Sequence, residues 1–354
     1  MKTGGAPGRP AGGAPGTAPL GAAPVPAARR RALAFLAPAL AALALLAAPA
    51  AARPAPPGPA GVESAPAAPL GTAAERADAE RVLRYWTPRR MRRARPLELA
   101  VDRRGRARVF PGPRLDAEAV AAYLRVPDPT AFPQSVNGRV FVRQAGQLGF
   151  CSGTAINSPT RQLVLTAGHC VHTGPDGPRG GVWSSHLQFV PAYSGGAAPF
   201  GAFVAQRATI RAPRQWVKHG NPAFDVGAFL TRPNFEGVNV ADAVGGGATI
   251  ALGLSRKQRF RTFGYPNRVK WLQACTSPYV GDDPLSYRLT GPPTLGIRCR
   301  WAPGASGGGW LIGDGTPEGT LINGINSYLR IDDRSRTYGP YFNEETVGRL
   351  VRGL

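Results

Sequence analysis

The feature that most limits the fold is a series of short strand-like runs that begins after Val136. Glycine and proline separate the runs, and the first long amphipathic pattern after Val136 lies at residues 344–351, at the C-terminus. Short strands with turn residues between them are typical of an antiparallel barrel or sandwich. Examples of the predicted strands are residues 139–143, 150–156, 163–166, 186–190, 202–210, 226–230, 260–263, 310–312 and 320–325.

Residues 29–52 have the pattern of a secretory signal. Three arginines at 29–31 precede an apolar run over residues 32–48, and small residues come next at Ala48 and Ala50. This order of a positive, an apolar and a small-residue region is that of a cleaved export signal. A membrane span is the alternative, but the run is short and contains Pro38. We therefore expect residues 1–52 to be leader and signal peptide, and the mature protein to be secreted, extracellular and without a stable membrane anchor.

The stretch from residue 53 to residue 135 differs from the chain after Val136 in composition and in its predicted secondary structure. Residues 53–70 are rich in alanine, proline and glycine and predict a disordered linker. Thr72 and Glu75 form a capping-box pattern that opens a predicted helix over residues 72–84. Short strands are expected within 97–110, and a second helix over 116–124. We interpret residues 53–135 as linker and prosegment and residues 136–354 as the main domain; an extension that stays attached is the alternative.

The formal net charge of +22 raises the question of nucleic-acid binding. In the second half of the chain the arginines are dispersed, without interleaved aromatic side chains or a known binding motif. The densest run, RRMRRAR over residues 89–95, precedes the main domain. We expect no nucleic-acid partner, although a basic exterior would favour anionic surfaces or acidic substrates.

The four cysteines allow three disulfide pairings. The simplest pairing joins Cys151 to Cys170 and Cys275 to Cys299, because each bridge then closes a short loop. Four free thiols and a zinc site are the alternatives, but no C-x-x-C spacing is present. The predicted export signal favours disulfides, since oxidising compartments stabilise them.

Three short motifs in one order carry the chemistry. They are LTAGHC around His169, FDVGAFL around Asp225 and PGASGGGW around Ser306. Taken alone, each has an ordinary structural explanation: a core histidine, a turn aspartate, a serine in a glycine-rich loop. Taken together after an export signal, they indicate nucleophilic catalysis, in which a weak hydroxyl nucleophile needs a neighbouring base.

The three motifs resemble those of the trypsin-like serine peptidases, and among these the bacterial secreted branch that includes the glutamyl endopeptidases. The resemblance covers about residues 138–350. It implies an all-β fold of two antiparallel six-stranded barrels with a short C-terminal helix. It also implies a secreted serine endopeptidase that is made as a zymogen, acts on proteins or peptides as a monomer, and needs no metal or other cofactor.

The resemblance also assigns roles to individual residues. His169 would take the proton of Ser306 and later pass it to the leaving amine, while Asp225 would hold the imidazole in place. The backbone N–H groups of Gly304 and Ser306 would form the oxyanion hole. A disulfide between Cys151 and Cys170 would staple the histidine loop to a strand, and Cys275–Cys299 would brace the loops that lead to Ser306.

Ala305 departs from the pattern of trypsin, where an aspartate before the nucleophile pairs with the newly cut amino terminus. An alanine cannot form that ion pair, so we expect activation to clear the active-site cleft or to free a loop. The proline cluster at 127–133 and the strand-like start at Arg139 place the expected mature N-terminus between Arg125 and Arg139.

The substrate pocket is the least defined part of the prediction. Arg300 lies six residues before Ser306, where the family builds the base of its primary pocket, and would favour an acidic substrate side chain. In the alternative interpretation, Arg300 points to solvent beside Cys299. Asn326 and Ser327 resemble the strand that pairs with the substrate backbone. A non-catalytic binding or adhesion module and an esterase on the same fold are the alternative functions.

Overall fold

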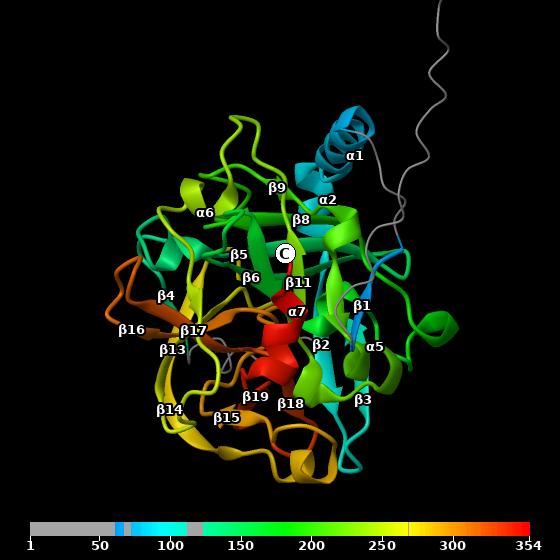
Figure 1. The fold of residues 1–354 in the computed structure, drawn as a ribbon, viewed down its shortest axis with the longest axis vertical. Coiled ribbons are helices and arrows are strands. Elements are labelled where there is room, and N and C mark those ends of the chain that lie inside the picture. Colours follow the sequence, from blue (N-terminus) through cyan, green and yellow to red (C-terminus); the bar gives the residue numbers. More distant parts are fainter. Residues whose placement is uncertain (1–60, 67–71, 112–122, 268) are drawn as a thin grey trace, which may run out of the picture. The chain divides into compact units, whose positions relative to one another are not determined.

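The computed structural model describes residues 61–66, 72–111, 123–267 and 269–354 (Figure 1). All of these belong to one compact unit, Ala52–Leu354. The predicted signal peptide and most of the predicted helix at 116–124 lie outside the described residues. Among the residues that the structure describes, no helix has the length and apolar character needed to cross a membrane.

A first group of antiparallel strands has the order β1–β10–β11–β7–β6–β5–β8–β9. Its core contains large buried side chains such as Phe141, Phe189 and Phe229. The strands are β1 (Val62–Ser64), β5 (Asn137–Gln144), β6 (Gln147–Ala155), β7 (Leu163–Thr166), β8 (Ser185–Pro191), β9 (Phe203–Val204), β10 (Arg211–Pro213) and β11 (Gly227–Leu230).

A second group of strands builds the rest of the main domain. Antiparallel pairs run in the order β4–β14–β13–β16–β17, and β14 continues through β15 and β19 to β18. Only the short β12–β17 pair of this group is parallel among the described strands. The strands are β4 (Leu124–Arg125), β12 (Thr249–Ile250), β13 (Arg259–Gly264), β14 (Gln273–Asp282), β15 (Leu295–Ile297), β16 (Gly309–Gly313), β17 (Thr320–Ile325), β18 (Tyr328–Arg330) and β19 (Thr337–Gly339).

Helices in the described residues are short, apart from α1. They are α1 (Thr72–Tyr85), α2 (Pro88–Arg93), α4 (Gly168–Val171), α5 (Arg214–His219), α6 (Val240–Ala243) and α7 (Arg349–Val351), which a π-helical turn at Glu344–Gly348 precedes. Single 3-10 turns lie at Gln134–Val136, Pro178–Gly180, Arg207–Thr209, Pro222–Phe224 and Pro284–Arg288. The expected fold class is confirmed: the protein is mostly β, with few short helices and one at the C-terminus.

Most predicted strands are confirmed, and the two largest differences have local causes. The run at 202–210 is a strand only at Phe203–Val204, because a 3-10 turn comes next at Arg207–Thr209. The hydroxyl of Thr209 fixes this turn by donating to the carbonyl of Gln206 and accepting from the N–H of Leu230. The long strand β14 was missed, because Pro278 and neighbouring turn residues interrupt its sequence pattern.

The segment before the main domain is docked along it rather than separate from it. Residues Val62–Ser64, expected in a disordered linker, instead pair antiparallel with β10. Helix α1, predicted over 72–84, buries Val82 and forms an ion pair of 2.9 Å between Glu75 and Arg232. At its end, the indole Nε1 of Trp86 donates to the carbonyl of His186 at 2.6 Å. These contacts hold the predicted prosegment at several points.

Strand β2 (Arg95–Val101) links the two strand groups. It forms a hairpin with β3 (Ala107–Pro111), and Gly105 has a positive φ of 77° in the turn between them. Its first residues pair parallel with β6, and its last three pair parallel with β18. In Figure 1, β2 is the cyan strand that runs between the green strands of the first group and the red strands β18 and β19.

Arg139 is a buried cation in the first strand group. Its guanidinium lies 4.3 Å from the ring centre of Phe150 and 4.8 Å from that of Tyr193, and it donates to the carbonyl of Val269 at 2.8 Å. The Nε atom has no hydrogen-bond partner among the described residues. Burial lowers the pKa of Arg139 to about 10. Aromatic faces and one carbonyl therefore replace the carboxylate that normally accompanies a buried cation.

This environment predicts opposite effects for two substitutions of Arg139. Arg139→Met keeps the volume and removes a desolvated charge, so we expect the free energy of unfolding to stay equal or to rise. Arg139→Ala leaves a cavity and should lower it by about 2–4 kcal/mol. Urea unfolding of both variants measures the difference. Equal losses in the two variants would show that the charge itself holds this part of the core together.

Candidate active site

The pairing of β7 with β11 brings His169 and Asp225 together. Thr166 at the end of β7 lies opposite Gly227 at the start of β11. The chain then turns into α4, which carries His169, while Asp225 precedes β11 by two residues. Nδ1 of His169 lies 2.8 Å from Oδ2 of Asp225, and the backbone N–H of His169 donates to Oδ1 at 2.6 Å. Both side chains are fully buried.

A glycine is required beside this pair. A Cβ atom on Gly168 would lie 2.9 Å from Oδ1 of Asp225 and 2.9 Å from the Trp216 ring, which is closer than real Cβ contacts. The glycine of the LTAGHC motif therefore allows the carboxylate to approach the histidine backbone. Gln144 fixes the same loop from the other side, because its Nε2 donates to the carbonyl of His169 at 2.8 Å.

Ser327 completes the environment of the carboxylate. Its hydroxyl donates to Oδ2 of Asp225 at 2.5 Å, so Ser327 joins Nδ1 and the backbone N–H of His169 in holding this carboxylate in one orientation. Sequence reasoning placed Ser327 in the substrate pocket and did not foresee this bond. Ser327 also lines the small pocket beside Ser306, so it takes part in both places.

Asn326 holds the loop that carries Ser306. Its Nδ2 donates to the carbonyls of Phe263 and Ala305, and its Oδ1 accepts from the indole of Trp310 at 2.7 Å. Its backbone also bonds to Gly307 and Gly308. Asn326 is 1% exposed, and its side chain supports the loop through these bonds.

The Ser306 loop depends on glycines with positive φ. Gly304 has φ +96° and Gly307 has φ +85°, a region that favours glycine. A Cβ on Gly304 would also lie 2.4 Å from the Phe150 ring. Ser152 holds this loop, because its N–H donates to the carbonyl of Ser306 and its hydroxyl donates to that of Gly304.

The groups that we expect to act on a substrate are hydrogen-bonded to another segment of the protein. The backbone N–H of Gly304 donates to the carbonyl of Leu97 at 3.1 Å, and the hydroxyl of Ser306 donates to the same oxygen at 3.4 Å. Nε2 of His169 is buried and has no hydrogen-bond partner among the described residues. The expected bond between Ser306 and His169 is therefore not formed in this arrangement.

A nearly filled pocket lies next to Ser306. Its volume for a water-sized molecule is about 10 Å³, and Glu98 is one of the residues around it. Burial raises the pKa of Glu98 from 4.5 to about 7, although the positive charges of Arg334 and His169 act in the opposite direction. The other lining residues are Leu99, Trp301, Ala302, Pro303, Ser306, Ser327, Tyr328, Leu329 and Thr337.

Arg300 does not line this pocket. Its side chain is exposed, and its Nε donates to the carbonyl of Arg334 at 3.2 Å. The indole of the next residue, Trp301, faces inward instead and donates to the hydroxyl of Thr262 at 2.9 Å. The observed position favours the alternative in which Arg300 points to solvent, and it gives no support to an acidic substrate preference.

Both cysteine pairs form disulfides, Cys151–Cys170 and Cys275–Cys299. The first joins β6 to the turn that carries His169, and the second joins β14 to the chain that leads to Ser306. Cys151, Cys170 and His169 lie within metal-ligand distance of one another. Because the two sulfurs are bonded to each other, this group does not offer thiolate ligands, and the zinc interpretation of the cysteines is wrong.

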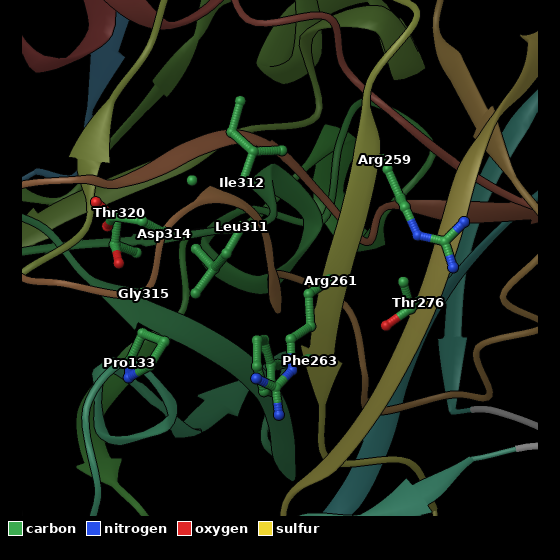
Figure 2. Close-up of a pocket in the computed structure, with 11 residues that line it drawn as sticks. Pro133, Arg259, Arg261, Phe263, Thr276, Leu311, Ile312, Asp314, Gly315 and Thr320 are labelled. Carbon is green, nitrogen blue, oxygen red and sulfur yellow. The ribbon is translucent and has the colours of Figure 1, made fainter.

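A cavity of about 440 Å³ lies apart from these residues. Figure 2 shows Arg259, Arg261 and Thr276 on one side of it and Asp314 and Thr320 on the other. His169, Asp225 and Ser306 are not among its lining residues. Its position separates it from the site described above.

Several solved proteins share this fold, although no family model matches the chain and a search of curated proteins finds no match. The protease Anisep from Arthrobacter nicotinovorans is 30% identical, with 61% of this chain and 95% of that chain covered and a TM-score of 0.53. The thermostable serine protease AL20 from an extremophilic microorganism is 29% identical, with the same coverage and TM-score.

A Glu endopeptidase is 16% identical, with 65% of this chain and 94% of that chain covered and a TM-score of 0.51, which supports the fold alone. The likeness to Anisep covers almost the whole of that protein, and it agrees with the buried His169–Asp225 pair and the glycine-bounded Ser306 loop. The chain belongs to the trypsin-like serine peptidases.

Proposed function

We propose that the chain is the precursor of a secreted serine endopeptidase in which His169, Asp225 and Ser306 are the catalytic residues. The observation that carries the proposal is the buried His169–Asp225 pair, with a contact of 2.8 Å, beside a serine whose loop aims a backbone N–H at a carbonyl oxygen. In this proposal Nε2 of His169 is the base and Oγ of Ser306 is the nucleophile.

The proposed reaction forms and then hydrolyses an acyl-enzyme. Oγ of Ser306 attacks the substrate carbonyl carbon while Nε2 of His169 takes its proton. The peptide C–N bond then breaks, and His169 returns the proton to the leaving amine. A water molecule repeats the sequence, releasing the carboxylic acid and restoring Ser306. The carboxylate of Asp225 stabilises the imidazolium, since His169 and Ser327 fix its orientation.

The oxyanion would bind at the N–H groups of Gly304 and Ser306. The N–H of Gly304 already donates to a carbonyl oxygen, that of Leu97, at 3.1 Å. This contact supports the proposed role, because a developing oxyanion would take the same place with a stronger bond. Loss of one such donor typically reduces the rate by about a hundred- to a thousandfold.

Maturation in this proposal removes the prosegment after export. Two disulfides and the predicted signal peptide support passage through an oxidising compartment. The ring of Tyr123 stacks on Trp301 at 4.5 Å, and β4 pairs with β14, so both belong to the peptidase body. This packing favours a mature N-terminus before Tyr123 over the expected one between Arg125 and Arg139.

The substitution Ser306→Ala tests the proposed function. We expect peptide hydrolysis by the matured enzyme to fall to a residual rate, since binding and the oxyanion hole alone give only about a thousandfold over water. The loss is measured with a peptide amide substrate and with the corresponding ester. The matched control is Ser335→Ala, because Ser335 is exposed. Ser152→Ala is not suitable, because Ser152 supports the loop that carries Ser306. Turnover near that of the unchanged enzyme would refute the assignment.

Ser327→Ala tests whether Ser327 positions Asp225 or binds substrate. Loss of a hydrogen bond to a charged group typically costs about 1.5–3 kcal/mol, so kcat should fall by about ten- to a hundredfold. KM should change little if the hydroxyl acts through Asp225. Steady-state kinetics with a peptide amide separates the two constants. An increase in KM with kcat unchanged would assign Ser327 to substrate binding instead.

A further inference from the structure

The register of β2 places part of the precursor in the groove beside the nucleophile. Arg95 and Pro96 lie opposite Gly149 and Phe150 of β6. Further along the strand, Leu99 lies opposite Tyr328, and Val101 lies opposite Arg330, both in β18. The N–H of Ile331 extends this ladder by donating to the carbonyl of Val101 at 3.0 Å. A continuous strand therefore crosses the site from β6 to β18.

The carbonyl of Leu97 occupies the reacting position on this path. It accepts from the N–H of Gly304 and from the hydroxyl of Ser306. Around it, the side chains of Leu97, Leu99 and Val101 are buried, with Leu99 at 0% exposed. The neighbouring pocket is nearly full, with Glu98 and Leu99 among the side chains that surround it. No room for a substrate residue is left there.

The direction of β2 explains why a carbonyl at the nucleophile need not be cut. In a productive complex, the residue that gives up its carbonyl carbon to Ser306 lies in the pocket beside β18. Here the residues beside β18 are Leu99 to Val101, and Glu98, which supplies the nitrogen of the Leu97–Glu98 bond, lines the pocket. Relative to the pocket, the residue with the carbonyl carbon and the residue with the leaving nitrogen have therefore exchanged places. This exchange follows because β2 runs parallel to β18. The leaving nitrogen lies on the pocket side of the carbonyl.

We propose that β2 is a built-in inhibitor that fills the substrate groove in the reverse chain direction, with Leu97 at the nucleophile and Glu98 in the primary pocket. This inference rests on the proposed peptidase function. It names the regulation of the same site: the precursor is inactive because its own strand occupies the groove, and it resists cutting because its amide bond is presented backwards.

The rest of the prosegment holds the inhibitor in place. Trp86 anchors it to β8, Glu75 pairs with Arg232, and β1 pairs with β10. Because these contacts tether β2 to the body, its effective concentration at the groove is high, on the order of millimolar for a short link. Removal of the tether, rather than insertion of a new amino terminus near Ala305, would then release the groove.

Labelling of Ser306 tests the inhibitor in the full-length chain. A fluorescent phosphonate that reacts with active-site serines is added to wild-type precursor, to the Leu99→Asp precursor and to mature enzyme. Leu99→Asp places a charge at a buried position opposite Tyr328 and should open the groove without cleavage. We expect the uncut variant band to label at least about tenfold faster than the uncut wild-type band, approaching the mature enzyme.

Two controls make the labelling result decisive. Arg108→Asp reverses the charge at an exposed position of β3, opposite Ala100, and should label as slowly as the wild type. Mature enzyme released from the Leu99→Asp precursor has the wild-type sequence, so its activity shows that the body folded. A Leu99→Asp precursor that labels at the wild-type rate would overturn the inhibitor. Mature enzyme that takes no label at Ser306 would overturn the proposed function itself.

The fragments that form during maturation test the reverse direction of β2 in the groove. Wild-type precursor is left to mature, and its first fragments are identified by mass spectrometry. We expect the first cuts to fall outside residues 95–101 and the Leu97–Glu98 bond to stay intact until the prosegment leaves the groove. A first cut at Leu97–Glu98 would show that β2 binds as an ordinary substrate, which contradicts the proposal.

Glu98 predicts how the inhibited state responds to pH. Because burial raises the pKa of Glu98 to about 7, against the charges of Arg334 and His169, the docked strand favours the protonated carboxyl. Docking of β2 is therefore strongest at pH values below the ordinary pKa of glutamate, and it weakens as the pH rises through about 7. The labelling rate of the precursor, divided by that of the mature enzyme at each pH, should rise by about tenfold or more between about pH 5 and about pH 8.

Glu98→Gln supplies the matched control for this pH dependence. The amide keeps the size of the side chain and cannot ionise, so the ratio of precursor to mature labelling rates should become nearly flat with pH. Dividing by the mature rate removes the pH dependence that both forms share. An unchanged slope in Glu98→Gln would exclude Glu98 as the group that controls docking.

Discussion

The antiparallel register between β7 and β11 is the constraint on which the site depends. It sets Thr166 against Gly227 and thereby brings His169 within 2.8 Å of Asp225. Burial of both groups makes this contact strong, because an unpaired carboxylate there would be costly. The disulfide Cys151–Cys170 and the bond from Gln144 keep the histidine turn in this register. A shift of one residue along β11 would separate the base from the group that orients it.

The features that depend on neighbouring residues could be predicted from the sequence. The strand runs and the glycine turns at 304 and 307 are local patterns, and most of the strands are present in the structure. Contacts between distant segments could not be predicted from such local patterns. The bond from Ser327 to Asp225, the inward position of Trp301 and the outward position of Arg300 depend on how loops from separate strands meet.

The path of β2 shows the same limit most clearly. Its alternating pattern predicts a strand, but nothing local indicates that it pairs with both β6 and β18 or that Leu97 reaches Ser306. Long-range strand pairing is set by the whole fold rather than by nearby residues. The absence of a charge at Ala305 then has a simple consequence. In the mechanism we propose, activation proceeds by withdrawal of a strand, which requires no ion pair with a new amino terminus.

The most direct test of the central claim is to trap the covalent intermediate. Mature enzyme is mixed with an activated peptide ester, quenched in acid within the first turnover and digested for mass spectrometry. We expect one added acyl group, attached to the peptide that contains Ser306. An acyl group on any other residue, or turnover without an acylated species, would contradict it.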